Sequence, residues 1–330
     1  MKTQITLLIA VLLALAAAAH AQTASTGSGQ AYPAKSVRIL VGFAPGGSTD
    51  LTARIFAQEL NKAWSQQVVV DNRPGASGMI GAELAAKSPP DGYTWLVSPQ
   101  TSIVVAPLIF KKVNYDPGKD FAPISVIGST PQLLVLHPSM PPKNFKEFSA
   151  FVKKNAKTLT YASGGFGSTP HMAGELLNTS LGVRVTHVPY KGENPGVADL
   201  LGGQIPYMFS NFPVVHPHVK AEKLRAVAIT SLKRSPLAPE FPTVAESGIP
   251  GFDTATWSGL YLPGATSRDV IRRVHAEIDK IQSAPAFRKR MLELGIDQSE
   301  ANTPEKHAAF VKSETEKWGT VIREAGVKVE

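Results

Sequence analysis

The chain has 330 residues, no cysteine and a formal net charge of +8 at pH 7, to which Lys2 contributes one unit. Without cysteine it has no disulfide and no thiolate metal site, so it must be stabilised by its hydrophobic core, and its length suggests two domains. The basic residues are scattered in short clusters rather than gathered in one patch, which argues against a nucleic acid partner.

The first 21 residues predict a secretory signal peptide. Lys2 precedes an apolar run from Ile5 to Ala19, and Ala19-His20-Ala21 fits the small-x-small cleavage pattern. The run is too short to favour a membrane span, which needs about 20 apolar residues. We therefore expect Sec-type export to the periplasm with cleavage after Ala21, a retained membrane anchor being the alternative. Residues 22–31 are polar and rich in Gly and Ser, which predicts a flexible leader.

Behind this leader, short apolar runs alternate with amphipathic segments. Extended runs are predicted at 37–43, 68–70, 93–98, 124–128, 132–136, 183–189, 207–210, 224–230 and 256–262. Helices are predicted at 49–64, 80–87, 144–155, 169–179 and 196–201, and two more at 267–282 and 304–325.

The alternation predicts an α/β fold with mostly parallel sheets and helices on both faces. No clear linker separates the two series of elements, so we expect two lobes whose chain crosses between them more than once. Ligands of open α/β sheets sit outside the carboxyl ends of the strands. A cleft between the lobes is therefore expected, as in a receptor that closes about a hinge.

One sequence motif occurs twice. A short apolar run leads into a glycine-rich turn, and two hydroxyl residues then begin a predicted helix. The copies run from Val37 to Asp50 and from Leu159 to His171. Neither is a nucleotide-binding loop, because Lys-Ser/Thr does not follow the glycines and Pro170 stands where a dinucleotide fingerprint needs glycine. A helix start exposes unpaired N–H groups and a partial positive charge, so two starts that face each other would hold a small anion. Simple helix capping is the alternative.

Other polar residues admit two interpretations each. Asp50 either complements the dipole of its helix or accepts a hydrogen bond from a ligand. Gln100 and Thr101 follow the third strand of the first lobe, near the same carboxyl edge. Tyr190, which precedes the flexible Lys191-Gly192 turn, either covers the ligand or anchors the core.

The histidines do not form a recognisable metal or catalytic site. His171 with Glu175, and His216 with His218, each lack a third metal ligand. Ser168 lies in Gly-Ser-Thr-Pro rather than in a Gly-x-Ser-x-Gly elbow. We therefore predict no metal, no cofactor and no catalytic residue. A secreted hydrolase that uses Ser168 or Asp50 with a histidine is the alternative.

Six motifs, taken in their order and spacing, carry a resemblance. They are Phe43–Asp50 (FAPGGSTD), Asn72–Ala76 (NRPGA), Pro90–Thr94 (PDGYT), Tyr115–Phe121 (YDPGKDF), His187–Gly192 (HVPYKG) and Phe241–Gly248 (FPTVAESG). From about Tyr32 to its end, the chain resembles the Bug family, the periplasmic substrate-binding proteins of tripartite tricarboxylate transporters.

The resemblance implies a non-enzymatic Venus-flytrap fold of two lobes, 32–129 with 230–330 and 130–229. It implies a solute receptor, expected to be a monomer, that delivers a small organic acid to the transporter's membrane subunits. A sensory accessory to a membrane kinase is the alternative. Together with the polar residues above, it predicts ligand contacts at Phe43, Ala44, Gly47, Ser48, Thr49, Asp50, Gln100, Thr101, Gly165, Gly167, Ser168, Thr169, Tyr190, Gly192 and Ser210.

One position departs from the family pattern. Relatives often carry Met-Phe-Asp where this chain has Met208-Phe209-Ser210. Losing that carboxylate removes a partner for a ligand amine, which favours a plain organic acid over an amino acid.

Overall fold

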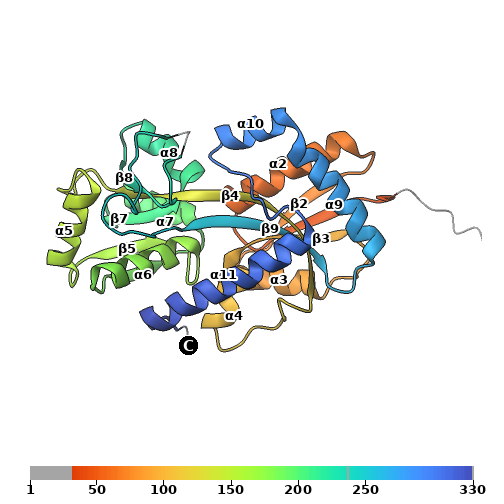
Figure 1. Cartoon of the computed structure of the whole chain (residues 1–330), viewed down its shortest axis with the longest axis horizontal. Coiled ribbons are helices and arrows are strands. Elements are labelled where there is room, and N and C mark those ends of the chain that lie inside the picture. Colours follow the sequence, from red (N-terminus) through yellow and green to blue (C-terminus); the bar gives the residue numbers. More distant parts are fainter. Residues whose placement is uncertain (1–31, 236–237, 329–330) are drawn as a thin grey trace, which may run out of the picture. The chain divides into compact units, whose positions relative to one another are not determined.

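The computed structural model describes residues 32–235 and 238–328, and the predicted signal peptide and leader lie outside them. The description below concerns the compact unit Lys35–Glu330 (Figure 1). Within the described residues, no helix is long and apolar enough to cross a membrane.

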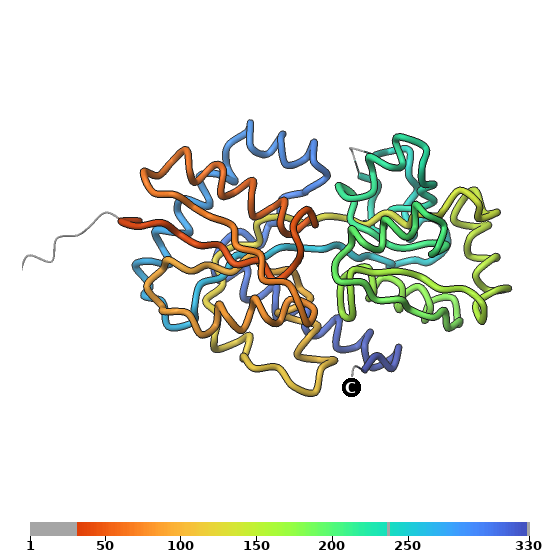
Figure 2. Tube along the Cα trace, turned by 180° about the vertical axis from the view of Figure 1, so that it is seen from behind, coloured from red at the N-terminus to blue at the C-terminus, as the bar shows by residue number. Residues whose placement is uncertain are grey.

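The first lobe is built on a sheet centred on β1 (Val37–Val41), which lies parallel to β2 (Val68–Asn72) and β3 (Thr94–Pro99). Four of the five residues of β1 are apolar and buried, Arg38 being the exception, and three of them are consecutive, as expected for a strand covered on both faces. The helices of this lobe are α2 (Ser48–Ala63), α3 (Met79–Ala86), α4 (Ala106–Ile109), α9 (Arg268–Ser283), α10 (Pro285–Glu293) and α11 (Pro304–Ala325). Of these, α2, α9 and α10 lie on one side of the sheet, and α3 and α4 lie on the other (Figures 1 and 2).

The second lobe has β7 (Tyr207–Asn211), β5 (Thr160–Ser163) and β6 (Thr186–Pro189), with β5 parallel to both of its neighbours. Its helices are α5 (Phe145–Asn155), α6 (Thr169–Leu181), α7 (Glu193–Leu201) and α8 (Phe212–Lys220). The last residues of β4 (Phe121–Leu136) pack alternately in two hydrophobic cores on opposite faces of the sheet. Leu134 and Leu136 belong to one core, and Leu133 and Val135 belong to the other. This period of two is what a strand between two helix layers requires.

Two long strands join the lobes. The first part of β4 (Phe121–Leu136) pairs with β9 (Ala255–Pro263), and its last residues lie between β7 and β8 (Arg225–Ile229), all antiparallel. Figure 1 shows β4 and β9 passing from one group of strands to the other. The predicted two-lobed α/β fold is confirmed, and the runs predicted at 124–128 and 132–136 prove to be one strand.

A buried polar cluster ties these crossings together. The Thr230 hydroxyl accepts from the Gln132 backbone N–H at 2.9 Å and donates to the Thr254 carbonyl at 2.6 Å. The Thr254 hydroxyl donates to the Gln132 side-chain oxygen at 3.0 Å. All three side chains are fully buried, so the two crossings are fixed side by side where the sheets meet.

The helix prediction is wrong in the last part of the chain, where three helices follow β9 instead of two. The additional helix, α10, begins at Pro285, two residues after α9 ends. Proline suits the first turn of a helix because its missing N–H has no intrahelical partner there. Helix α8 was not predicted either. Its Pro213 lies in the first turn, where proline is compatible with a helix for the same reason.

Candidate functional site

Both glycine-rich loops line one pocket of about 540 Å³, a volume that includes space open to solvent. Three helices begin at its wall: α2 at Ser48, α6 at Thr169 and α7 at Glu193. The caps that precede α2 and α7 are Gly47 and Gly192, which have no side chain to cover the first N–H groups. Helix N-termini from both lobes therefore present donors and partial positive charge to the same space.

The predicted contact residues fall into three groups. The pocket is lined by Phe43, Ala44, Gly47, Ser48, Thr49, Asp50, Thr101, Ser168, Thr169 and Gly192. Gly165 and Tyr190 line an adjoining hollow. Gln100, Gly167 and Ser210 are not among the described lining residues of either space.

Each of these three supports a neighbour instead. The Gln100 side-chain oxygen accepts from the Trp257 backbone N–H at 3.5 Å. The Gly167 N–H donates to His171 Nδ1 at 3.0 Å, and the Ser210 hydroxyl donates to Glu193 Oε2 at 2.7 Å.

Asp50 organises the first loop. Its Oδ2 accepts from the Gly46 N–H and from Arg54 Nε, both at 2.9 Å, and its Oδ1 accepts from Asn72 Nδ2 at 2.9 Å. Burial opposes ionisation, but the donors from Arg54, Gly46 and Asn72 outweigh it and lower the pKa of Asp50. The Asp50 carboxylate is thus turned toward its own loop, where Gly46 has a positive φ of 84°.

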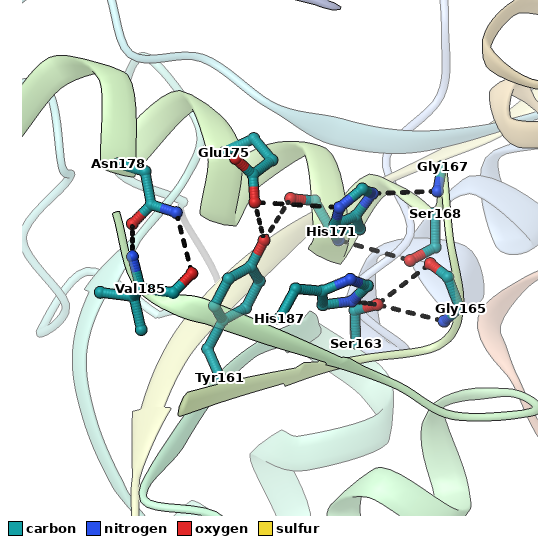
Figure 3. A network of polar contacts seen from close by, with 10 residues as sticks. All are labelled: Tyr161, Ser163, Gly165, Gly167, Ser168, His171, Glu175, Asn178, Val185 and His187. Atoms are coloured by element: carbon teal, nitrogen blue, oxygen red, sulfur yellow. Dashed lines mark hydrogen bonds and ion pairs between the residues drawn. The ribbon is translucent and has the colours of Figure 1, made fainter. Parts of the chain in front are cut away.

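A buried network beneath the second loop sets its shape (Figure 3). The Ser168 hydroxyl caps α6 by accepting from the His171 N–H at 3.3 Å. Ser163 Oγ accepts from the Gly165 N–H at 3.1 Å, donates to the Gly165 carbonyl at 3.0 Å and lies 2.6 Å from His187 Nε2. Because Ser163 has a single hydroxyl proton, it can donate to only one of the Gly165 carbonyl and His187 Nε2 at a time.

The two imidazoles of this network are neutral. His171 and His187 are stacked with their ring centroids 4.0 Å apart. Burial lowers the pKa of His171 to about 4. Burial, and then the neighbouring His171, lower the pKa of His187 to about 2. His171 Nδ1 accepts from Gly167, which requires the unprotonated nitrogen. The His171 ring therefore holds the loop backbone and makes no described hydrogen bond with the Ser168 hydroxyl, unlike a hydrolase base.

Three hydrogen bonds close the loops across the cleft. Asn211 Nδ2 donates to Ser48 Oγ at 2.9 Å. The Ser77 hydroxyl donates to the Phe166 carbonyl at 2.6 Å. Asn194 Nδ2 donates to the Pro45 carbonyl at 3.4 Å. Each bond joins a segment of the first lobe to one of the second.

Sequence reasoning missed several lining residues. Thr256 is the second residue of β9, Asn211 is the last residue of β7, and Glu193 and Asn194 are the first two residues of α7. The Thr169 and Thr256 hydroxyls and Asn211 Oδ1 are buried without a hydrogen-bond partner among the described residues. Buried polar atoms are nearly always paired, so this concentration in one pocket is typical of a binding site. The carboxyl end of β7 was an available signal for Asn211.

The pocket lining contains two acidic side chains, Asp50 and Glu193, and no lysine, arginine or histidine among its described residues. Nor do the described residues contain a group of three His, Cys, Asp or Glu able to hold a metal ion. Apart from these two carboxylates, the pocket offers backbone N–H groups, hydroxyls and amides, which suit a small polar anion.

Comparison with known proteins identifies close relatives. A sequence model of the family described as "Tripartite tricarboxylate transporter family receptor" matches residues 52–327. Protein BugT of Bordetella pertussis is 34% identical over 328 residues, which cover 99% of each chain. The structure "R. palustris Rpa4515 with adipate" has a TM-score of 0.87 at 32% identity and covers 90% of this chain and 99% of that one. The structure "MatC (Rpa3494) from Rhodopseudomonas palustris with bound malate" has a TM-score of 0.82 at 32% identity. The match covers 88% of this chain and 100% of that one.

Proposed function

Because this chain belongs to the tripartite tricarboxylate transporter family receptors, we propose that it captures a small organic acid in the periplasm and delivers it to a membrane transporter. The family match confirms the resemblance to Bug proteins. The observation that carries the proposal is the convergence of α2, α6 and α7 on one pocket lined by unpartnered hydroxyls.

The ligand carboxylate is assigned to the two loops, at Ser48 and Thr49 on one side and Ser168 and Thr169 on the other. Two solved relatives, with adipate and with malate, support a carboxylate as the ligand class. The lobes are assigned to 32–129 with 230–330 and to 130–229. Binding involves no turnover, because a receptor releases its solute unchanged.

Isothermal titration tests the proposal. Purified mature protein is titrated with a panel of carboxylic acids and, as the control, with their amides, which lack the negative charge. We expect an acid to bind, its amide to bind far more weakly, and mass spectrometry to recover the acid unchanged. Failure of every acid to bind the folded protein, or conversion of a bound acid, would refute the proposal.

Delivery and export need separate measurements. Deleting the chromosomal gene for this chain is expected to abolish uptake of the bound acid, and a copy of the gene is expected to restore it. Amino-terminal sequencing of periplasmic protein is expected to begin at Gln22. Light scattering is expected to give the mass of one chain.

A further inference from the structure

Glu193 places a carboxylate inside a pocket assigned to an anion. Its side chain lines the pocket at the first residue of α7. Its stem lies close to the second loop, since a Cβ added at Gly164 would come within 3.2 Å of Glu193 Cγ. The sequence predicted that this region lacks a carboxylate, because Ser210 stands where relatives often have Asp. Glu193 supplies a carboxylate at the same place, since the Ser210 hydroxyl donates to Glu193 Oε2 at 2.7 Å.

The hydrogen bonds of Glu193 favour its ionised form. Oε2 accepts from the Ser210 hydroxyl and, at 2.9 Å, from the Asn211 backbone N–H, and Oε1 accepts from Asn211 Nδ2. Two of these donors are N–H groups, which cannot accept a proton in return. The N-terminus of α7 also favours a negative charge at this position.

Among the described lining residues, none is a cation that could pair with this carboxylate. The donors to Glu193 are neutral, whereas Asp50 is paired with Arg54. Burial raises the pKa of Glu193, against the effect of its hydrogen bonds. A buried carboxylate is stabilised by a cation or a further donor, and a second anion beside it is repelled. Oε1 has one described donor and therefore retains an acceptor site.

The same network reaches the first loop. Asn211 Nδ2 donates to both Glu193 Oε1 and Ser48 Oγ. The unpartnered Thr169 and Thr256 hydroxyls, on side chains 1% and 6% exposed, line the same space. Glu193 therefore lines the same space as the N-termini of α2 and α6.

We infer that Glu193 selects a ligand with a single ionised carboxylate and a hydrogen-bond donor, an ammonium or a hydroxyl group, and rejects a second ionised carboxylate. The inference rests on the proposed function, because it assumes that the two loops hold the first carboxylate. It differs from the sequence-based prediction, which favoured a plain organic acid over an amino acid.

The test compares straight-chain acids of matched length, from propanoate to hexanoate, that end in an ammonium, a hydroxyl or a second carboxylate. Affinities are measured by titration at neutral pH. For the length that binds best, we expect an amino or hydroxy acid to bind at least about tenfold more tightly than the dicarboxylate. The tighter of the two identifies the donor.

Three variants assign the preference to Glu193. Glu193→Gln removes the charge and should bring the ratio of the two affinities to within about threefold. Glu193→Asp keeps the charge and should keep the preference. Glu305→Gln is the matched control, because Glu305 lies in the first turn of α11 with an exposed side chain and outside the pocket. It should leave the ratio unchanged.

The outcomes separate the two claims. If the dicarboxylate binds wild-type protein more tightly at every length, or Glu193→Gln leaves the preference intact, the inference fails while the receptor function stands. If no acid of any class binds, the proposed function fails and the inference fails with it. If Glu193→Gln does not fold by circular dichroism, the wild-type ratio decides alone.

Discussion

The unpartnered hydroxyl of Thr169 offers a sharp test of the site. Thr169→Val replaces the hydroxyl by a methyl group of similar size, and both side chains are β-branched. In the ligand-free protein the change removes a buried group that has no described partner, so the free energy of unfolding should stay the same or rise. In the complex it removes a hydrogen bond to a charged carboxylate, which is worth about 1.5–3 kcal/mol. The Kd should therefore rise by about 10- to 150-fold.

A second buried threonine provides the control. The Thr266 hydroxyl donates to the Pro263 carbonyl at 2.7 Å, away from the pocket. Thr266→Val should lower the free energy of unfolding by about 1 kcal/mol and leave the Kd unchanged. Urea denaturation and isothermal titration measure the two quantities. If Thr169→Val behaves like this control, losing stability but not affinity, the hydroxyl has a structural role and the assignment of the site is wrong.

Three more perturbations test the scaffold of the loops. Asp50→Asn should lower the free energy of unfolding by about 1–3 kcal/mol, because Arg54 loses its charged partner. It should also weaken ligand binding, because the first loop loses a hydrogen-bonded support. An unchanged urea midpoint together with an unchanged Kd would contradict this prediction. Ser168→Ala should cost about 1 kcal/mol of stability through the lost helix cap, measured by thermal unfolding, as well as affinity. Below its ordinary pKa of 6.5, His171 takes up a proton in the unfolded chain but not in the folded one until about pH 4. His171 should therefore contribute a fall in stability of about 1.4 kcal/mol per pH unit as the pH drops through that interval. Burial also lowers the pKa values of His187 and His307, so these two residues add to the slope. His171→Asn should reduce the slope by about 1.4 kcal/mol per pH unit in denaturation curves recorded across the interval, and an unaltered slope would refute the role of His171.

The parts of the site that the sequence predicted are those with a local signature. A turn and a helix start within six residues are predicted by Gly46, Gly47 and the hydroxyl residues that follow them. The same holds for Gly165 to Thr169. Local signals also placed α2 and α6 to within two residues at either end.

Two of the residues that were missed, Thr256 and Asn211, depend on long-range register. Thr256 reaches the pocket because it pairs with Thr130 on β4, and Asn211 does so because it pairs with Gln132 of the same strand. Periodicity shows which face of a strand is buried, but it does not fix which residue of a distant strand lies opposite. A shift of one residue would turn each of these side chains to the other face.

In the proposed receptor, the division of the carboxylate site between two lobes couples binding to closure. The N-terminus of α2 belongs to the first lobe, and those of α6 and α7 belong to the second, each with a partial positive charge of about one half. A carboxylate that meets one lobe gains part of this field, and it gains the rest only when the lobes approach. A ligand shifts a conformational equilibrium only by its differential affinity for the two states. In the proposed site, the second set of N-termini and the Thr169 hydroxyl supply that difference, and the hydrogen bond from Asn211 to Ser48 adds to the stability of the closed arrangement. The described lining residues include no lysine or arginine that could hold the anion on one side alone, so we expect separation of the lobes to be enough to release it.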